Sequence, residues 1–228
     1  MILLRYWVKL NKAIYNYVKN KVINCILFDF DGVLIDSLPA MEIAWKSVQK
    51  KFGISNTFKD YKKYIGLPFE EILKQLNINK KYHEEIKDHY SKISSQNKEL
   101  IKLNPYVNYT LDWLRCNFIK TGIVTSKDKV RTLDLIQYFQ LNVEIVVTPD
   151  LTEFGKPSSQ PILLAAKNLK LNPNEIIFVG DMESDMHCAF NANCHYLHYK
   201  NGYQYLYHQM YGGEINSILE LIEYIENI

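Results

Sequence analysis

The residues best suited to catalysis lie near the start of the chain, where two acids follow an apolar run. Residues 25–28 are all apolar and lead into Asp29 and Asp31, which are separated by one residue, and Gly32 follows. Unpaired negative charge at the edge of a core is unfavourable, so we expect a cationic group beside these acids. A metal ion together with a phosphate ester would fit such a position.

Three further polar groups stand after apolar runs or in loops. Thr125 and Ser126 form a hydroxyl pair after the run 122–124. Lys156 stands between a glycine and a proline, and Asp181 and Asp185 follow the run that ends at position 180. If Asp181 begins a helix, one turn places Asp185 on the same side.

The elements that must position these groups are predicted by five apolar runs of strand length. Helical patterns at 128–139, 161–169 and 183–191 separate the later runs, and continuous apolar strands alternating with helices indicate a parallel sheet covered on both faces. Ligands of such sheets bind beyond the carboxyl ends of the strands, where each candidate residue falls. The fold class is therefore α/β, a doubly wound, Rossmann-like parallel sheet. The predicted strands span residues 23–30, 119–125, 144–148, 176–180 and 194–199.

The segment 37–103 breaks this alternation, because it carries helical periodicity and polar turns without a convincing strand. We read it as a small helical cap inserted into a core made of residues 22–36 and 104–228, with a closing helix at 216–228. Residues 1–21 are expected to form an N-terminal amphipathic helical extension that packs on the domain or on another subunit. Surface attachment to a membrane is the alternative, but we do not expect membrane contact through residues 1–20.

Composition narrows the classes of partner. The 228 residues include 27 basic and 25 acidic ones, which gives a formal net charge of +2. This near-neutral balance gives no electrostatic reason to expect nucleic-acid binding. The apolar stretch at the N-terminus is too short and too charged for a transmembrane span and lacks the pattern of a signal peptide. None of the four cysteines forms a CxxC pair, which favours buried free thiols and a reducing, cytoplasmic setting. The expected assembly is a monomer or homodimer.

The order acid pair, hydroxyl, lysine, acid pair resembles that of the haloacid dehalogenase superfamily, and the resemblance spans residues 24–200. The helical insert after the first acid pair looks like the cap of the phosphoglycolate phosphatase and β-phosphoglucomutase branch. The resemblance implies a phosphatase that acts on a small-molecule phosphate ester with Mg²⁺, a cation that prefers oxygen ligands and keeps several waters.

The resemblance also implies a role for each residue. Asp29 is the expected nucleophile, forming an aspartyl-phosphate. Asp31 points the same way on an extended segment and is the expected general acid and base.

The remaining groups bind the phosphate and the metal. Lys156 is expected to supply a positive charge to the nucleophile and the transferring group. The phosphate is expected to bind Thr125, Ser126 and Lys156, and Gly32 permits close backbone approach. The expected metal ligands are Asp29, Asp31 through its backbone carbonyl, Asp181 and, through water or by orienting its neighbours, Asp185.

Plainer interpretations of the motif residues stay open. Thr125 and Ser126 also suit a cap for the helix at 128, Lys156 suits a solvated loop, and Asp185 suits an exposed helix face. Outside the enzymes, the alternative function is that of a non-catalytic binding protein that retains the fold.

Departures from the family pattern reduce the number of reactions that the chain could catalyse. Mutases of this branch carry a histidine where this chain has Met41, and an arginine is missing after the cap loop at 66–68. A phosphosugar mutase therefore stands as the second candidate enzyme. Dehalogenases and phosphonatases lack the second acid, which is present as Asp31. The apolar cap loop favours a small or weakly charged leaving group.

Overall fold

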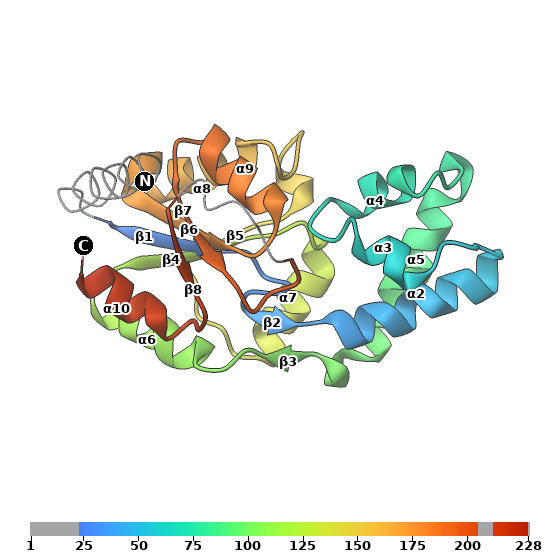
Figure 1. Ribbon diagram of the computed structural model, residues 1–228, viewed down its shortest axis with the longest axis horizontal. Coiled ribbons are helices and arrows are strands. Elements are labelled where there is room, and N and C mark those ends of the chain that lie inside the picture. Colours follow the sequence, from blue (N-terminus) through green and yellow to red (C-terminus); the bar gives the residue numbers. More distant parts are fainter. Residues whose placement is uncertain (1–22, 205–211, 228) are drawn as a thin grey trace, which may run out of the picture.

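The computed structural model describes residues 23–204 and 212–227 and has two lobes (Figure 1). The larger lobe is built on a six-stranded parallel sheet with the spatial order β5-β4-β1-β6-β7-β8. The α/β doubly wound fold predicted from the sequence is confirmed. The strands are β1 (Cys25–Phe28), β4 (Lys120–Val124), β5 (Ile145–Val147), β6 (Ile176–Gly180), β7 (His195–Tyr199) and β8 (Gly213–Ile215).

Helices cover both faces of this sheet because alternate residues of each strand point to opposite faces. Ile26 and Phe28 of β1 pack into one apolar cluster with residues of α6 (Val107–Cys116), α7 (Lys129–Tyr138) and α10 (Glu220–Glu226). Cys25 and Leu27 pack on the other face with α8 (Gln160–Leu169) and α9 (Glu183–Asn191). Burying both faces of β1 fixes the direction in which its carboxyl end projects.

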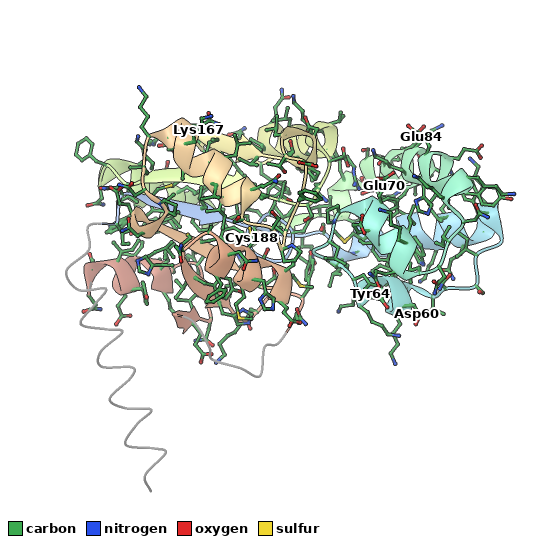
Figure 2. All side chains as sticks on the ribbon, turned by 90° about the horizontal axis from the view of Figure 1, so that it is seen from above. Asp60, Tyr64, Glu70, Glu84, Lys167 and Cys188 are labelled. Carbon is green, nitrogen blue, oxygen red and sulfur yellow. The ribbon has the colours of Figure 1, made fainter. Side chains whose placement is uncertain are left out.

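The smaller lobe is helical and has its own apolar cluster, centred on the fully buried Trp45 and on Tyr90. Figure 2 shows the same division from above: Asp60 and Glu84 lie on this lobe, and Lys167 lies on the sheet lobe. Its helices are α2 (Leu38–Phe52), α3 (Phe58–Lys62), α4 (Phe69–Gln75) and α5 (His83–Gln96), with the short 3₁₀ turns η1 (Lys80–Tyr82) and η2 (Lys98–Leu100).

A short antiparallel ribbon joins the lobes, pairing β2 (Ile35–Asp36) with β3 (Lys102–Leu103). This ribbon and the strand β8 are absent from the sequence-based expectation, because each of these short strands contains a charged residue and none forms an apolar run. Two more 3₁₀ turns, η3 (Pro149–Leu151) and η4 (Pro173–Glu175), complete the elements of the sheet lobe.

The expected extension at 1–21 lies outside the described residues, and the domain boundaries stay predictions. Within 23–204 and 212–227, every helix is too short or too polar to cross a bilayer. The four cysteines are free thiols, and Cys25 and Cys188 are buried.

Candidate active site

Three neighbouring strands deliver the predicted polar residues to one edge of the sheet. Strand β1 lies between β4 and β6, and Phe28 is in register with Ile123 and Val179. Asp29 and Thr125 therefore leave the sheet side by side, and Asp181 follows the end of β6. All the residues singled out from the sequence gather at this edge: Asp29, Asp31, Gly32, Thr125, Ser126, Lys156, Asp181 and Asp185.

Lys156 lies at the centre of the acidic residues. Its Nζ is 2.8 Å from Asp29 Oδ1 and 2.6 Å from Asp185 Oδ1, and all three side chains are buried. Burial opposes the charge of this ammonium, but the carboxylates of Asp185 and Asp29 outweigh it and raise the pKa of Lys156 well above its usual value. Lys156 is therefore a permanently charged group held between two carboxylates, and the interpretation of it as a solvated loop lysine is wrong.

Among the described residues, the hydrogen-bond donors to Asp29 engage only one of its two carboxylate oxygens. Its Oδ1 accepts hydrogen bonds from Lys156 and from the backbone N–H of Phe30 at 2.7 Å. Burial raises the pKa of Asp29 to about 7, the carboxylate of Asp185 adds to this rise, and Lys156 opposes it. Burial and the carboxylate of Asp185 therefore outweigh the effect of Lys156 on the pKa of Asp29.

Asp185 lies in the first turn of α9 and pairs with the lysine, whereas Asp181 precedes this helix, which begins at Glu183. Asp185 Oδ2 accepts the backbone N–H groups of Met182 at 3.0 Å and Asp181 at 3.2 Å, which satisfies donors at the start of α9. A Cβ on Gly180 would collide with Asp185, so the glycine permits this close packing. Asp185 is fully buried, so it is not the exposed helix-face charge that the spacing left open.

The carboxylate of Asp181 is only half satisfied. Its Oδ2 accepts the backbone N–H of Tyr203 at 2.5 Å, whereas its buried Oδ1 has no hydrogen-bond partner among the described residues. Burial, together with Asp185 and Asp29, raises the pKa of Asp181 well above its usual value. Oxygens of Asp29, Asp181 and Asp185 lie within 4.8 Å of one another, so these acids can hold a metal ion.

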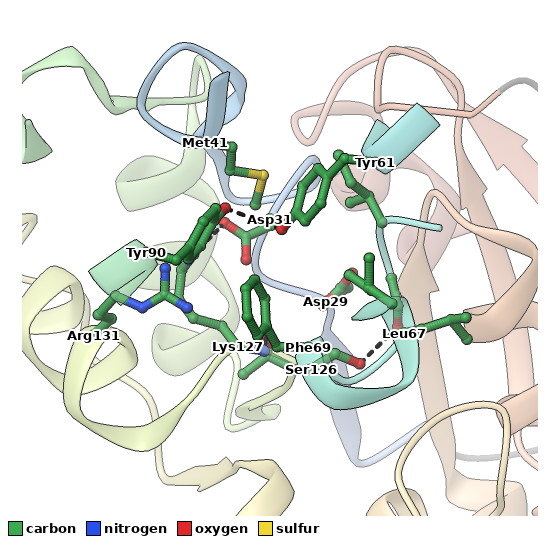
Figure 3. Close-up of a pocket in the computed structure, with 14 residues that line it drawn as sticks. Asp29, Asp31, Met41, Tyr61, Leu67, Phe69, Tyr90, Ser126, Lys127 and Arg131 are labelled. Carbon is green, nitrogen blue, oxygen red and sulfur yellow. Dashed lines mark hydrogen bonds and ion pairs between the residues drawn. The ribbon is translucent and has the colours of Figure 1, made fainter. Parts of the chain in front are cut away.

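Asp31 faces a pocket between the lobes, and its Oδ1 has two donors (Figure 3). Ser37 donates its hydroxyl to this oxygen, and Lys127 Nζ lies 2.9 Å from it. Burial lowers the pKa of Lys127, although Asp31 opposes this effect. Asp31 therefore pairs with Lys127, whereas Asp29 pairs with Lys156.

The two hydroxyl residues take different positions in the site. Thr125 Oγ1 accepts the backbone N–H of Lys127 at 3.1 Å, and its own hydrogen has no acceptor within residues 23–204 and 212–227. Ser126 Oγ donates to the carbonyl oxygen of Gly66 in the helical lobe at 2.7 Å, so its side chain joins the two lobes. Because the Ser126 hydroxyl is occupied by this contact, the group of Ser126 that could bind an anion is its backbone N–H.

Sequence reasoning missed three residues that the structure places here. Lys127 and Arg131 line the pocket next to Asp31. Tyr203 Oη accepts the backbone N–H of Ser37 at 2.7 Å, so it connects the loop after β7 with the residue between β2 and α2. Lys127 could have been identified from its position in the sequence, because it stands two residues after Thr125 in the same loop at the end of β4.

The comparisons with known proteins agree with this geometry. Residues 26–198 match the model of the haloacid dehalogenase-like hydrolase family. The chain is 29% identical over 184 residues to a phosphorylated carbohydrates phosphatase of Thermotoga maritima, which covers 73% of this chain and 80% of that protein. It is also 27% identical over 195 residues to a phosphoglycolate phosphatase of Nitrosococcus oceani. This match covers 79% of this chain and 85% of that protein.

Solved structures agree as well. A haloacid dehalogenase-like hydrolase from Bacteroides fragilis is 26% identical and superimposes with a TM-score of 0.80, covering 87% of this chain and 99% of that one.

Proposed function

This chain belongs to the haloacid dehalogenase-like hydrolase family, and on that premise we propose that it uses Mg²⁺ and a phosphoryl intermediate on Asp29. The family and its phosphatase relatives make it a hydrolase that acts on phosphate monoesters. The proposal concerns how it does so and which residues act.

Asp29 is the proposed nucleophile. In the part of the chain that the structure describes, both donors to Asp29 engage Oδ1, so Oδ2 is the oxygen available to attack phosphorus. Attack forms an acyl-phosphate bond, and the bond between phosphorus and the leaving oxygen breaks. Lys156, fixed by Asp185, stays close to the oxygen that carries the nucleophile's charge and limits its repulsion with the phosphate.

The acidic cluster fits a divalent cation. Asp29, Asp181 and Asp185 face one lysine, so the buried group has excess negative charge, and Oδ1 of Asp181 lacks a partner among the described residues. Asp29 and Asp181 would hold Mg²⁺ directly, with Asp185 orienting Lys156 and the resemblance adding the carbonyl of Asp31. When bound, the ion neutralises charge that builds on the phosphate oxygens.

Asp31 is the proposed proton carrier. Its Oδ1 is held by Ser37 and Lys127, which leaves Oδ2 to give a proton to the leaving oxygen. The deprotonated carboxylate then takes a proton from water, whose oxygen attacks the phosphorus of the aspartyl-phosphate. Inorganic phosphate leaves and the Asp29 carboxylate is restored.

The remaining residues bind the transferring group or cover it. We propose that Thr125 donates its hydroxyl, and Ser126 its backbone N–H, to phosphoryl oxygens. The contact from Ser126 to Gly66 supports a cap, built from 37–103, that closes over the site and excludes water. Met41 lines the pocket beside Asp31 and supplies no base, so nothing here favours the mutase alternative.

The observation that carries the proposal is the bridge that Lys156 makes between Asp29 and Asp185. The test is hydrolysis of p-nitrophenyl phosphate and a panel of phosphate esters, with Mg²⁺ and with a chelator. Asp112→Asn, an exposed change on α6, serves as the control for Asp29→Asn. We expect activity that needs Mg²⁺ and is lost only in Asp29→Asn. A wild-type protein as inactive as Asp29→Asn on every ester would favour the non-catalytic alternative.

A further inference from the structure

The pocket beyond Asp31 has an apolar wall and a cationic end (Figure 3). The helical lobe contributes aliphatic and aromatic side chains, as its sequence predicts. The sheet lobe contributes two cations, Lys127 and Arg131, which alter the expectation of a weakly charged leaving group. The apolar wall consists of Met41, Tyr61, Ile65, Leu67, Phe69, Ile72 and Tyr90.

Arg131 reaches this pocket with an unused donor. Its side chain is buried, with 8% of the residue exposed, and its Nε lies 2.5 Å from Asp128 Oδ2. The buried Nη1 has no hydrogen-bond partner among the described residues. Leaving a guanidinium N–H without an acceptor is unfavourable, so a ligand that supplies an acceptor there gains a charge-assisted hydrogen bond.

The guanidinium is held in place before any ligand binds. Arg131 Cζ lies 5.1 Å from the centroid of the Tyr90 ring, and the Tyr61 hydroxyl donates to the Tyr90 hydroxyl at 3.0 Å. Asp128, which also accepts the backbone N–H of Arg131 at 3.1 Å, fixes the other end of the side chain. A planar donor fixed on both sides loses little conformational freedom on binding.

The two cations of the pocket are not equally paired. Lys127 Nζ lies 2.9 Å from Asp31 Oδ1, whereas Arg131 contacts Asp128 through Nε and its Nη1 has no hydrogen-bond partner among the described residues. A second anionic group on the substrate would supply the acceptor that Arg131 lacks.

We propose that Arg131 is a specificity-determining residue that binds an anionic group on the leaving group of the ester, with Lys127 beside it. The substrate class is then a small phosphate monoester with a second anion, either a carboxylate or a phosphate. This inference rests on the proposed function, because it takes Asp31 to mark the leaving-group side.

The experiment compares pairs of phosphate monoesters that differ in one anionic group. For the carboxylate source the pair is 2-phosphoglycolate and 2-hydroxyethyl phosphate, and for the phosphate source it is ethylene glycol bisphosphate and 2-hydroxyethyl phosphate. We expect the wild type to prefer the anionic member of at least one pair by about tenfold or more in kcat/KM. The preferred pair identifies the source of the anion.

Arg131→Gln is expected to lower kcat/KM for that anionic member by about 10- to 100-fold and for its neutral partner by less than about threefold. Arg131→Lys should retain part of the preference. Arg115→Gln is the matched control, since Arg115 also pairs with an aspartate three residues earlier but lies exposed on α6. An equal loss on both members would mean that Arg131 is only structural and would overturn the proposal.

The outcomes separate this inference from the proposed function. A wild type that hydrolyses p-nitrophenyl phosphate but shows no preference within either pair contradicts the anion subsite alone. A wild type inactive on every ester contradicts both. If Arg131→Gln does not fold, inhibition of wild-type p-nitrophenyl phosphate hydrolysis decides: the anionic ester must inhibit at a lower concentration than its neutral partner.

Discussion

Lys156 and Asp185 form a buried ion pair of 2.6 Å, and Asp185 is held in turn by two backbone N–H groups at the start of α9. The position of the lysine is therefore set by the chain that follows β6, although its neighbour Asp29 comes from β1. The surroundings of Asp29, the proposed nucleophile, thus depend on a residue that follows a different strand.

Removing the lysine should affect both activity and stability. Lys156→Met leaves Asp29 and Asp185 buried without their cation, which we expect to lower the free energy of unfolding by about 3–5 kcal/mol in metal-free protein. Loss of the charge near the nucleophile should also lower kcat by about 10²- to 10³-fold. Urea denaturation and steady-state kinetics measure the two effects.

The exposed pair of Lys74 and Glu71 supplies the comparison, since Lys74→Met should change stability by no more than about 0.5 kcal/mol. If Lys156→Met keeps more than a tenth of the wild-type kcat, Lys156 does not have the role proposed for it.

The role of Asp31 predicts a dependence on the leaving group. Asp31→Asn should slow single-turnover alcohol release from an alkyl phosphate by about 10²- to 10⁴-fold, because an alkoxide needs a proton to leave. Release of p-nitrophenolate, a stable anion, should slow far less in the same variant. Equal slowing of both esters would argue against proton donation by Asp31.

Metal binding should stabilise the protein in a pH-dependent manner. The pKa of Asp29, about 7 in the folded protein, lies above the usual value of 3.8, so folding favours its protonated form. In metal-free protein this contribution to stability is complete below about pH 4 and is lost as the pH rises through 7. Mg²⁺ competes with these protons and should therefore bind better at high pH.

We expect Mg²⁺ at about 100 times its Kd to raise Tm by roughly 5–10 °C at pH 8. The same concentration should raise Tm far less at pH 5. Thermal melts with and without the metal measure this difference, and Asp181→Asn should abolish it. A metal effect that is the same at both pH values would contradict the assignment of the acidic cluster as the binding site.

Gly32 and Gly53 form a matched pair for testing the turn after the first motif. Both have positive φ, +91° and +65°, but a Cβ on Gly32 would collide with the carboxylate of Asp181, whereas one on Gly53 meets nothing within 4 Å. Gly53→Ala should cost about 1–2 kcal/mol of stability and leave kcat unchanged.

Gly32→Ala should cost more stability than Gly53→Ala and also weaken Mg²⁺ binding, because it displaces Asp181. Denaturation curves and metal titrations of both variants test this. Equal effects of the two substitutions would show that the collision with Asp181 is relieved without consequence.

The sequence predicts most of the candidate active site because the ends of the strands can be recognised in it. Asp29, Thr125 and Asp181 each follow an apolar run, and adjacent parallel strands then bring them together. Lys156 could be predicted only through the resemblance, since its loop has no periodic pattern and its burial depends on Asp29 and Asp185.

The sequence does not predict the pocket beyond Asp31. Arg131 is one residue of a helix whose Val130 and Leu133 are exposed, and nothing local shows that its side chain turns toward Tyr90. Tyr203 likewise contacts Ser37 across 166 positions of sequence. Contacts between residues that are distant in the sequence depend on how the folded segments pack together. A local pattern of residue types does not contain this information.

The central claim is that Asp29 carries the phosphoryl group, and chemical trapping tests it most directly. Wild-type protein turning over an ester with Mg²⁺ is quenched in acid and reduced with borohydride, which converts an aspartyl-phosphate into homoserine. Peptide mass spectrometry should find homoserine at position 29, and only when substrate was present. Phosphate on another residue, or full turnover with no trapped intermediate at Asp29, would contradict the mechanism.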